Sequence, residues 1–122
     1  SAQRLSCGSD FIQLSGNDDM TLGMMAMGAK GAISVTANVA PKLCADFQNA
    51  CLNGDFAEAL KLQDILYPLH DALFCEPSPG PVKYALKRLG ICEEDVRLPL
   101  VPISDAARLQ VDGALAHARL LG

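Results

Sequence analysis

Short apolar runs alternate with glycine-rich turns in the first third of the chain, which is the pattern of strands joined by helices. Residues 11–14 form a mostly apolar run that ends in turn-forming residues, which predicts a buried strand and a tight loop. Residues 32–35 predict a second strand. Between them, the methionine-rich segment 20–27 predicts a helix that Asp18 or Asp19 can cap. Two strands with a helical crossover should lie parallel, and such a pair is not stable without further strands.

From residue 41 onward the apolar positions recur at helical spacing, and no further strand is predicted. Asp55 and Glu58 have the spacing of a capping box, and Ser104 can cap the last helix. The proline-rich segment 75–81 interrupts regular structure. The predicted helices cover residues 41–53, 55 to about 73, 82–89, and 105 to about 121.

The composition suits a chain that packs against more protein than it contains. Half of the 122 residues are hydrophobic and 20% are charged, which is more apolar than a small domain needs to cover its own core. The length suits one domain but falls short of the roughly 250 residues of an ordinary (β/α)8 barrel. Because the sequence starts in a helical pattern without methionine, we expect Ser1 to be a boundary made by truncation or cleavage.

Charge and cysteine content indicate an acidic cytoplasmic protein. The formal net charge is −4 and the ten Lys and Arg are scattered, so nucleic acid is not an expected partner. The five cysteines are odd in number and widely spaced, which favours neither a disulfide framework nor a zinc site. The longest weakly charged stretch, residues 20–39, is broken by glycines and Asn38, so no membrane span is predicted.

Four segments carry a specific resemblance to a known family. They are LSGND at 14–18, GAISVTANV at 31–39, YPLHDALFCEPSPGPVKYAL at 67–86 and RLPLVPIS at 97–104. Together, and in this order, they strongly resemble the dihydrodipicolinate synthase family of pyruvate-dependent lyases, which is related to N-acetylneuraminate lyase. The resemblance covers residues 1–121, and the second and third segments are its most specific part.

The resemblance implies an α/β fold, namely the C-terminal portion of a (β/α)8 TIM barrel followed by a helical tail. Residues 11–14 would be the seventh strand and residues 32–35 the eighth. Residues 1–53 would then supply the last two βα units, and residues 54–122 a C-terminal helical region. The chain should therefore be mostly helical by content.

The same resemblance implies a Schiff-base lyase that condenses pyruvate with L-aspartate 4-semialdehyde in the diaminopimelate route to lysine. A lysine on the sixth strand forms the imine, which is the electron sink of the reaction, and neither a cofactor nor a metal is implied. That lysine would lie before Ser1, so no catalytic residue is expected in this chain, and the chain alone should be inactive. Its expected partners are the missing N-terminal half of the barrel and the other subunits of a homotetramer.

Within the chain, the resemblance assigns substrate binding to three residues near the ends of the two strands. The main-chain carbonyl of Ile33 would face pyruvate, and the backbone of Gly16 would approach the second substrate. Asn17 stands where many relatives carry aspartate, which puts a charge-based role there in doubt. Plainer interpretations are that Ile33 is a core strand residue and that Gly16 is required by the turn.

Other polar residues are weaker candidates. Ser34, Thr36 and Asn38 could form a substrate-binding row, but Thr36 is more typical of a turn hydroxyl and Asn38 of a helix cap. His70 and His117 have no acid or cysteine partner in the sequence pattern. We interpret both histidines as packing or surface residues.

None of three suggestively placed lysines is expected to form the imine. Lys30 precedes the second strand at the wrong end of the barrel, Lys83 lies in the helical tail, and Lys42 begins a helix.

Two alternative functions stay open. One is an N-acetylneuraminate lyase or sugar-acid aldolase of the same family, and the other is a stand-alone, non-catalytic fragment that self-associates.

Overall fold

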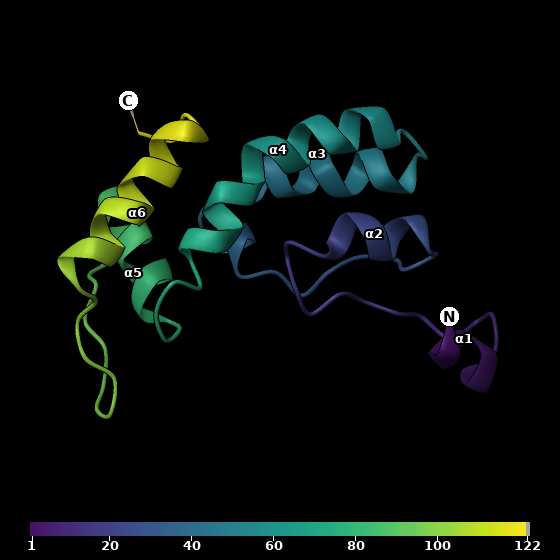
Figure 1. Cartoon of the computed structure of the whole chain (residues 1–122), viewed down its shortest axis with the longest axis horizontal. Coiled ribbons are helices and arrows are strands. Elements are labelled where there is room, and N and C mark those ends of the chain that lie inside the picture. Colours follow the sequence, from purple (N-terminus) through teal and green to yellow (C-terminus); the bar gives the residue numbers. More distant parts are fainter. Residues whose placement is uncertain (122) are drawn as a thin grey trace.

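The computed structural model describes residues 1–121, and the chain is mostly helical, as expected (Figure 1). Its helices are α1 (Ala2–Cys7), α2 (Thr21–Ala26), the 3-10 helix η1 (Thr36–Asn38), α3 (Pro41–Leu52), α4 (Phe56–Ala72), α5 (Gly80–Arg88) and α6 (Asp105–His117). The final residue of the predicted region 54–122 lies outside the described range. None of the described helices is both long and apolar enough to cross a membrane.

Local capping signals set the start of two helices. At the start of α4 the side chain of Asp55 accepts a hydrogen bond from Glu58 N at 3.0 Å. At the start of α6, Ser104 Oγ accepts one from Ala107 N at 3.2 Å. Both side chains cap their helices as predicted, because each satisfies an amide that has no partner inside its helix. The second half of the capping box is not formed, since Asp55 N donates to Ala50 O at 2.9 Å and not to Glu58.

The predicted cap of α2 is wrong. α2 begins after Met20, and no side-chain hydrogen bond caps it. Asp18 turns instead toward Val35 N and Thr36 N, the amides at the start of η1. These amides also lack helical partners, so Asp18 caps a helix that lies later in the chain.

The two predicted strands are reduced to one parallel bridge between Ser15 and Ala32. Ser15 N donates to Gly31 O at 2.9 Å, and Ile33 N donates to Ser15 O at 2.8 Å. Among residues 1–121 these runs form no longer ladder. The parallel direction agrees with the expected crossover, but the extent of pairing does not.

Four large apolar side chains of these two runs are exposed, so the prediction of a buried first strand is wrong for this chain. They are Phe11 (54% exposed), Ile12 (68%), Leu14 (48%) and Ile33 (73%). Parallel strands are stable when other strands flank them and helices cover both faces. Within the described range the chain has helices but no strand beside these two runs, so no further strand pairs with them.

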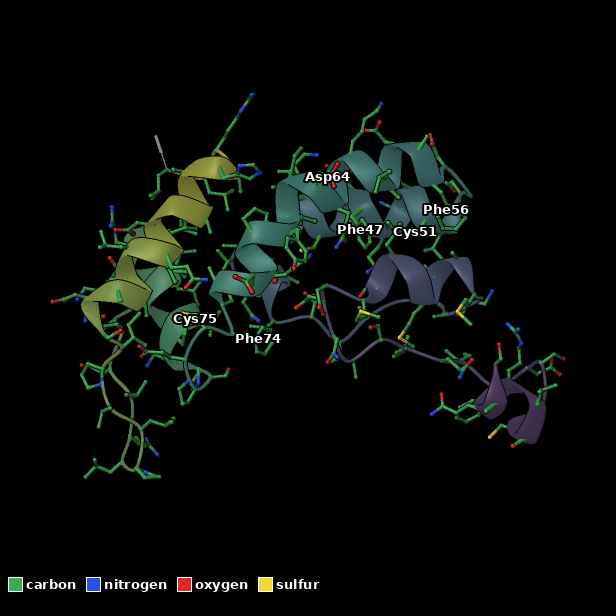
Figure 2. All side chains as sticks on the ribbon, in the orientation of Figure 1. Phe47, Cys51, Phe56, Asp64, Phe74 and Cys75 are labelled. Carbon is green, nitrogen blue, oxygen red and sulfur yellow. The ribbon has the colours of Figure 1, made fainter. Side chains whose placement is uncertain are left out.

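The core lies along α4, which packs against α2 and α3 on one part of its length and against α6 on another. α3 and α4 pack side by side, α2 packs against both of them, and α6 packs against α4 and α5 (Figure 1). Figure 2 shows Phe47 and Cys51 on α3 in this region, and both are buried. Leu66 and Leu69 of α4 are fully buried. By contrast, α1 lies at one end of the molecule and has no buried residue.

Leu66→Ala should lower the free energy of unfolding by about 2–5 kcal/mol, because it removes a fully buried side chain and leaves a cavity beside α4. Leu60→Ala on the same helix is the matched control, since Leu60 is 51% exposed. Its effect should be within about 0.5 kcal/mol. Urea unfolding followed by helical circular dichroism measures both variants. Equal losses would contradict the packing of α4.

Candidate functional site

A pocket of about 320 Å³ lies between the loop that follows Ser15 and the C-terminal half of α4. Its walls come from this loop, from α4 and the residues just after it, and from α6. The lining residues are Asn17, Asp18, Asp19, Tyr67, His70, Asp71, Phe74, Cys75 and Gln110. Figure 2 shows Phe74 and Cys75 where the chain leaves α4.

The carboxylate of Asp18 ties two loops together. Asp18 is 7% exposed, and its Oδ2 accepts hydrogen bonds from Val35 N at 2.9 Å and from Thr36 N at 3.2 Å. A buried carboxylate needs such donors, because burying it without them would be strongly unfavourable. The loop after the first predicted strand is therefore bound to the loop after the second.

His70 extends this network to α4. Thr36 Oγ1 lies 2.8 Å from His70 Nδ1 and 3.4 Å from Asp18 Oδ2, and Thr36 and His70 are 0% and 4% exposed. Since a carboxylate only accepts, Thr36 donates to Asp18 and the Nδ1–H of His70 donates to Thr36. His70 Nε2 is then an acceptor, and it has no hydrogen-bond partner among residues 1–121.

Burial keeps the side chains beside this carboxylate uncharged. It lowers the pKa of His70 below the ordinary 6.5, and the charges of Asp18 and Asp19 oppose this shift without reversing it. Burial also raises the pKa of the Cys44 thiol to about 11, with Asp18 adding to the rise and a hydrogen bond with Ser34 opposing it. At neutral pH the network therefore consists of a neutral imidazole, a hydroxyl and a carboxylate.

The three predicted substrate-binding residues lie around Ser15. Gly16 follows it directly, Ile33 N donates to its carbonyl at 2.8 Å, and Asn17 N donates to its hydroxyl at 3.2 Å. Asn17 lines the pocket, whereas Gly16 and Ile33 are not among its lining residues. Backbone pairing thus brings the three together, while the pocket itself is built mostly from other residues.

Gly16 is not required by the geometry of its turn. Its φ lies outside the left-handed region, and a Cβ placed there would meet no heavy atom within 4 Å. The interpretation that the turn needs a glycine is therefore wrong for this chain. The space beside Gly16 is therefore open within the described chain.

Ile33 presents its side chain to solvent, so the interpretation of it as a core residue is wrong for this chain alone. It is 73% exposed, because none of the helices of residues 1–121 covers it. Within residues 1–121 its carbonyl accepts no hydrogen bond, whereas its amide is bound to Ser15 O. The carbonyl is thus available to a group from outside the chain.

Two of the weaker candidates bind their own loop. Ser34 Oγ accepts from Ala37 N at 2.9 Å, and Asn38 Nδ2 donates to Val35 O at 3.0 Å. Asn38 does not cap α3, whose N-cap position is Ala40. His117 is exposed and lies 3.3 Å from Asp64 O. None of these contacts forms part of the pocket.

The pocket can bind polar groups but holds no activated nucleophile. No lysine is among its lining residues. Of the lysines considered above, Lys42 pairs with Asp46 at 2.6 Å on α3, and Lys83 donates to Asp95 O. Cys75 lines it, but burial raises the pKa of this thiol, which disfavours the reactive thiolate. In the described part of the chain, no group of three or more His, Cys, Asp or Glu side chains is placed to hold a metal.

The sequence does not reveal the roles of Asp18 and His70. Interpreting His70 as a packing residue is right about its burial but misses its bond to Thr36. One signal was available: His70 lies beside Leu69 on the apolar face of a helix, and a buried histidine needs a polar partner. No sequence pattern identifies Thr36 as that partner.

A family model described as the dihydrodipicolinate synthetase family matches residues 2–118. A 4-hydroxy-tetrahydrodipicolinate synthase of Zymomonas mobilis subsp. mobilis is 64% identical over 122 residues, which cover 99% of this chain and 42% of the relative. The enzyme of the same name from Rhizorhabdus wittichii is 65% identical over 119 residues, which cover 97% of this chain and 41% of the relative. The chain therefore spans about two fifths of the length of these curated relatives.

Solved structures agree with these matches. The chloride-inhibited dihydrodipicolinate synthase of Acinetobacter baumannii, complexed with pyruvate, has a TM-score of 0.92 at 35% identity, over 98% of this chain and 41% of that one. The synthase of Thermotoga maritima has a TM-score of 0.89 at 40% identity, over 93% of this chain and 38% of that one. The helices and loops described above are therefore arranged as they are in these enzymes.

Lowering the pH below 6.5 should destabilise the folded chain, because the unfolded state takes up a proton at His70 that the folded state resists. Above the pKa of His70 in the unfolded chain, this residue leaves the free energy of unfolding unchanged. Below that pKa, the free energy of unfolding should fall by up to about 1.4 kcal/mol per pH unit. His70→Asn places an amide near the Nδ1 position but cannot titrate, so it should remove this slope.

His117→Asn is the matched control and should keep the slope, because His117 lies outside the buried network. Urea denaturation at about pH 7.5 and about pH 5.5 measures the difference for each variant. A slope that survives in His70→Asn would contradict the buried, neutral histidine.

Proposed function

Since the chain belongs to the dihydrodipicolinate synthetase family, we propose that it is the C-terminal part of a Schiff-base lyase that condenses pyruvate with L-aspartate 4-semialdehyde in lysine biosynthesis. The observation that carries this proposal is the family match over residues 2–118, together with a 64% identical relative that matches 99% of the chain. The relatives' shared name favours this reaction over that of N-acetylneuraminate lyase or a sugar-acid aldolase.

We place residues 1–53 in the last two βα units of the barrel and residues 54–122 in the helical region that follows it. The parallel bridge between Ser15 and Ala32 supports this placement, because it has the direction that two barrel strands require. The exposed side chains of Phe11 and Ile33 would then pack against the strands and helices of the missing barrel half.

The chemistry of the proposed reaction needs a lysine from the part of the enzyme that precedes this chain. Its amine attacks the keto carbon of pyruvate, water leaves, and loss of a methyl proton gives an enamine that attacks the aldehyde carbon. This chain contributes the walls of the site. The Ile33 carbonyl would face bound pyruvate, and Gly16 and Asn17 would border the second substrate.

Several features of the chain support these roles. The Ile33 carbonyl accepts no hydrogen bond from residues 1–121, and the position of Gly16 is open to an approaching molecule. Asn17 borders the pocket, so it can donate to a substrate without adding charge. We further propose a cytoplasmic homo-oligomer, since the five free cysteines suit a reducing compartment and the exposed apolar side chains suit burial against other protein.

Trapping with pyruvate and borohydride tests whether the imine-forming lysine lies outside this chain. The probe is a hybrid enzyme in which this chain replaces the matching segment, 42% of the length, of the Zymomonas mobilis synthase. Borohydride reduces the imine to a stable amine, so intact mass should show one adduct on the hybrid, and peptide mapping should place it before the junction. The 122-residue chain alone should give no adduct. An adduct on the chain itself would overturn the assignment of the lysine.

Gly16→Ala in the hybrid enzyme should raise KM for aspartate semialdehyde roughly tenfold, with KM for pyruvate little changed, because the added methyl group would meet the second substrate. The folded chain should tolerate the change, since nothing lies within 4 Å of the new atom. Gly113→Ala is the control, because a Cβ at that helical position also meets nothing. Unchanged kinetics in Gly16→Ala would exclude close approach of substrate at this loop.

A further inference from the structure

We infer that His70 is a positioning residue for substrate binding: through Thr36 and Asp18 it fixes the two loops that carry Ile33 and Gly16. The inference rests on the proposed function, because it assigns these two backbone groups to the substrates. It gives the helical region a part in the active site, since His70 comes from α4 and not from the barrel units.

The first step of this coupling is the double hydrogen bond to Asp18. Its Oδ2 binds Val35 N at 2.9 Å and Thr36 N at 3.2 Å, so it holds the backbone two and three residues after Ile33. Asp18 itself lies two residues after Gly16 in the other loop. Movement of Asp18 would therefore shift both substrate-facing segments relative to each other.

A second crosslink closes the arrangement on the other side. Ile33 N donates to Ser15 O at 2.8 Å, and Ser15 directly precedes Gly16. The two loops are thus joined before the substrate-facing groups by the Ser15 bridge and after them by the carboxylate of Asp18. Without the Asp18 carboxylate, the two loops would be joined only before the substrate-facing groups, by the backbone hydrogen bonds from Lys30 N–Gln13 O at 2.9 Å to Ile33 N–Ser15 O.

His70 supports the Asp18 crosslink through Thr36. Thr36 is fully buried and its hydroxyl lies 2.8 Å from His70 Nδ1, so the imidazole fixes the hydroxyl orientation that lets Thr36 donate to Asp18. At 3.4 Å the Thr36–Asp18 contact is long, and it depends on this orientation. The other polar side chains that line the pocket with His70 are Asn17, Asp18, Asp19, Tyr67, Asp71, Cys75 and Gln110.

Kinetics of the hybrid enzyme test this role through a matched set of variants. His70→Phe keeps a ring without a donor, and Thr36→Val keeps the shape of threonine without its hydroxyl. Both should lower kcat/KM for pyruvate about tenfold, mainly through KM. His70→Asn can donate from near the Nδ1 position and should restore most of the loss, whereas His70→Gln donates near Nε2 and should not. His117→Phe, at an exposed position at the end of α6 and outside the network, should behave as the parent.

The double variant His70→Phe with Thr36→Val should be no worse than the poorer single variant, because both changes break the same link. A His70→Phe enzyme that melts at lower temperature but keeps its kcat/KM would show a purely structural role and overturn the inference. So would equal kinetics for His70→Asn and His70→Gln. The borohydride adduct keeps the two proposals apart: if the parent hybrid forms it while His70→Phe has parental kinetics, the proposed function stands and the positioning role falls.

A measurement on the chain alone covers the case of an inactive hybrid. In 15N-labelled protein, His70→Phe should shift the amide signals of Val35, Thr36 and Ile33, while His117→Phe should leave them unchanged. Amide signals that do not move in His70→Phe would overturn the coupling without reference to any enzyme activity.

Discussion

The burial of the Asp18 carboxylate is the constraint on which the arrangement of the loops depends. A hydrogen bond to a charged group contributes about 1.5–3 kcal/mol, against about 0.5–1.5 kcal/mol for a neutral one. By these magnitudes each hydrogen bond to Asp18 stabilises the loops more than each neutral backbone hydrogen bond around Ser15 and Ala32. Removing the carboxylate would also leave those two amides without partners. The loops keep their shape because the Asp18 side chain binds the amides of Val35 and Thr36.

The same constraint explains how this chain retains an enzyme-like arrangement with so little sheet. Its helices pack among themselves, with the fully buried Leu66 and Leu69 on α4, and they need no strand to do so. The two strand segments pair only around Ser15 and Ala32, and Phe11 and Ile33 stay exposed. The matched relatives are more than twice as long as this chain.

How far the sequence predicts the structure depends on how local each signal is. The caps at Asp55 and Ser104 lie three residues from the amides they bind, so the starts of α4 and α6 are readable from the sequence. Asp18 also lies just before a helix, as a capping residue would. Its carboxylate nevertheless binds two amides 17 and 18 residues away and does not cap α2.

The candidate site shows the same limit. Family resemblance finds Gly16, Asn17 and Ile33, which the backbone does bring together around Ser15. It does not find the Thr36–His70 contact, which joins residues 34 apart and depends on how α4 packs over the loops. Exposure of Ile33 was likewise unpredictable from its apolar run, because burial of a strand is decided by its neighbours and not by its own residues.

Nitrogen NMR of the His70 imidazole tests the central claim most directly, because the tautomer and the charge of this ring report the hydrogen bond to Thr36. The account predicts a ring that carries its proton on Nδ1 and is still mostly neutral at pH 6.5, the ordinary histidine pKa. A ring protonated on Nε2, or one that is half charged at that pH, would contradict the link from α4 through Thr36 to Asp18.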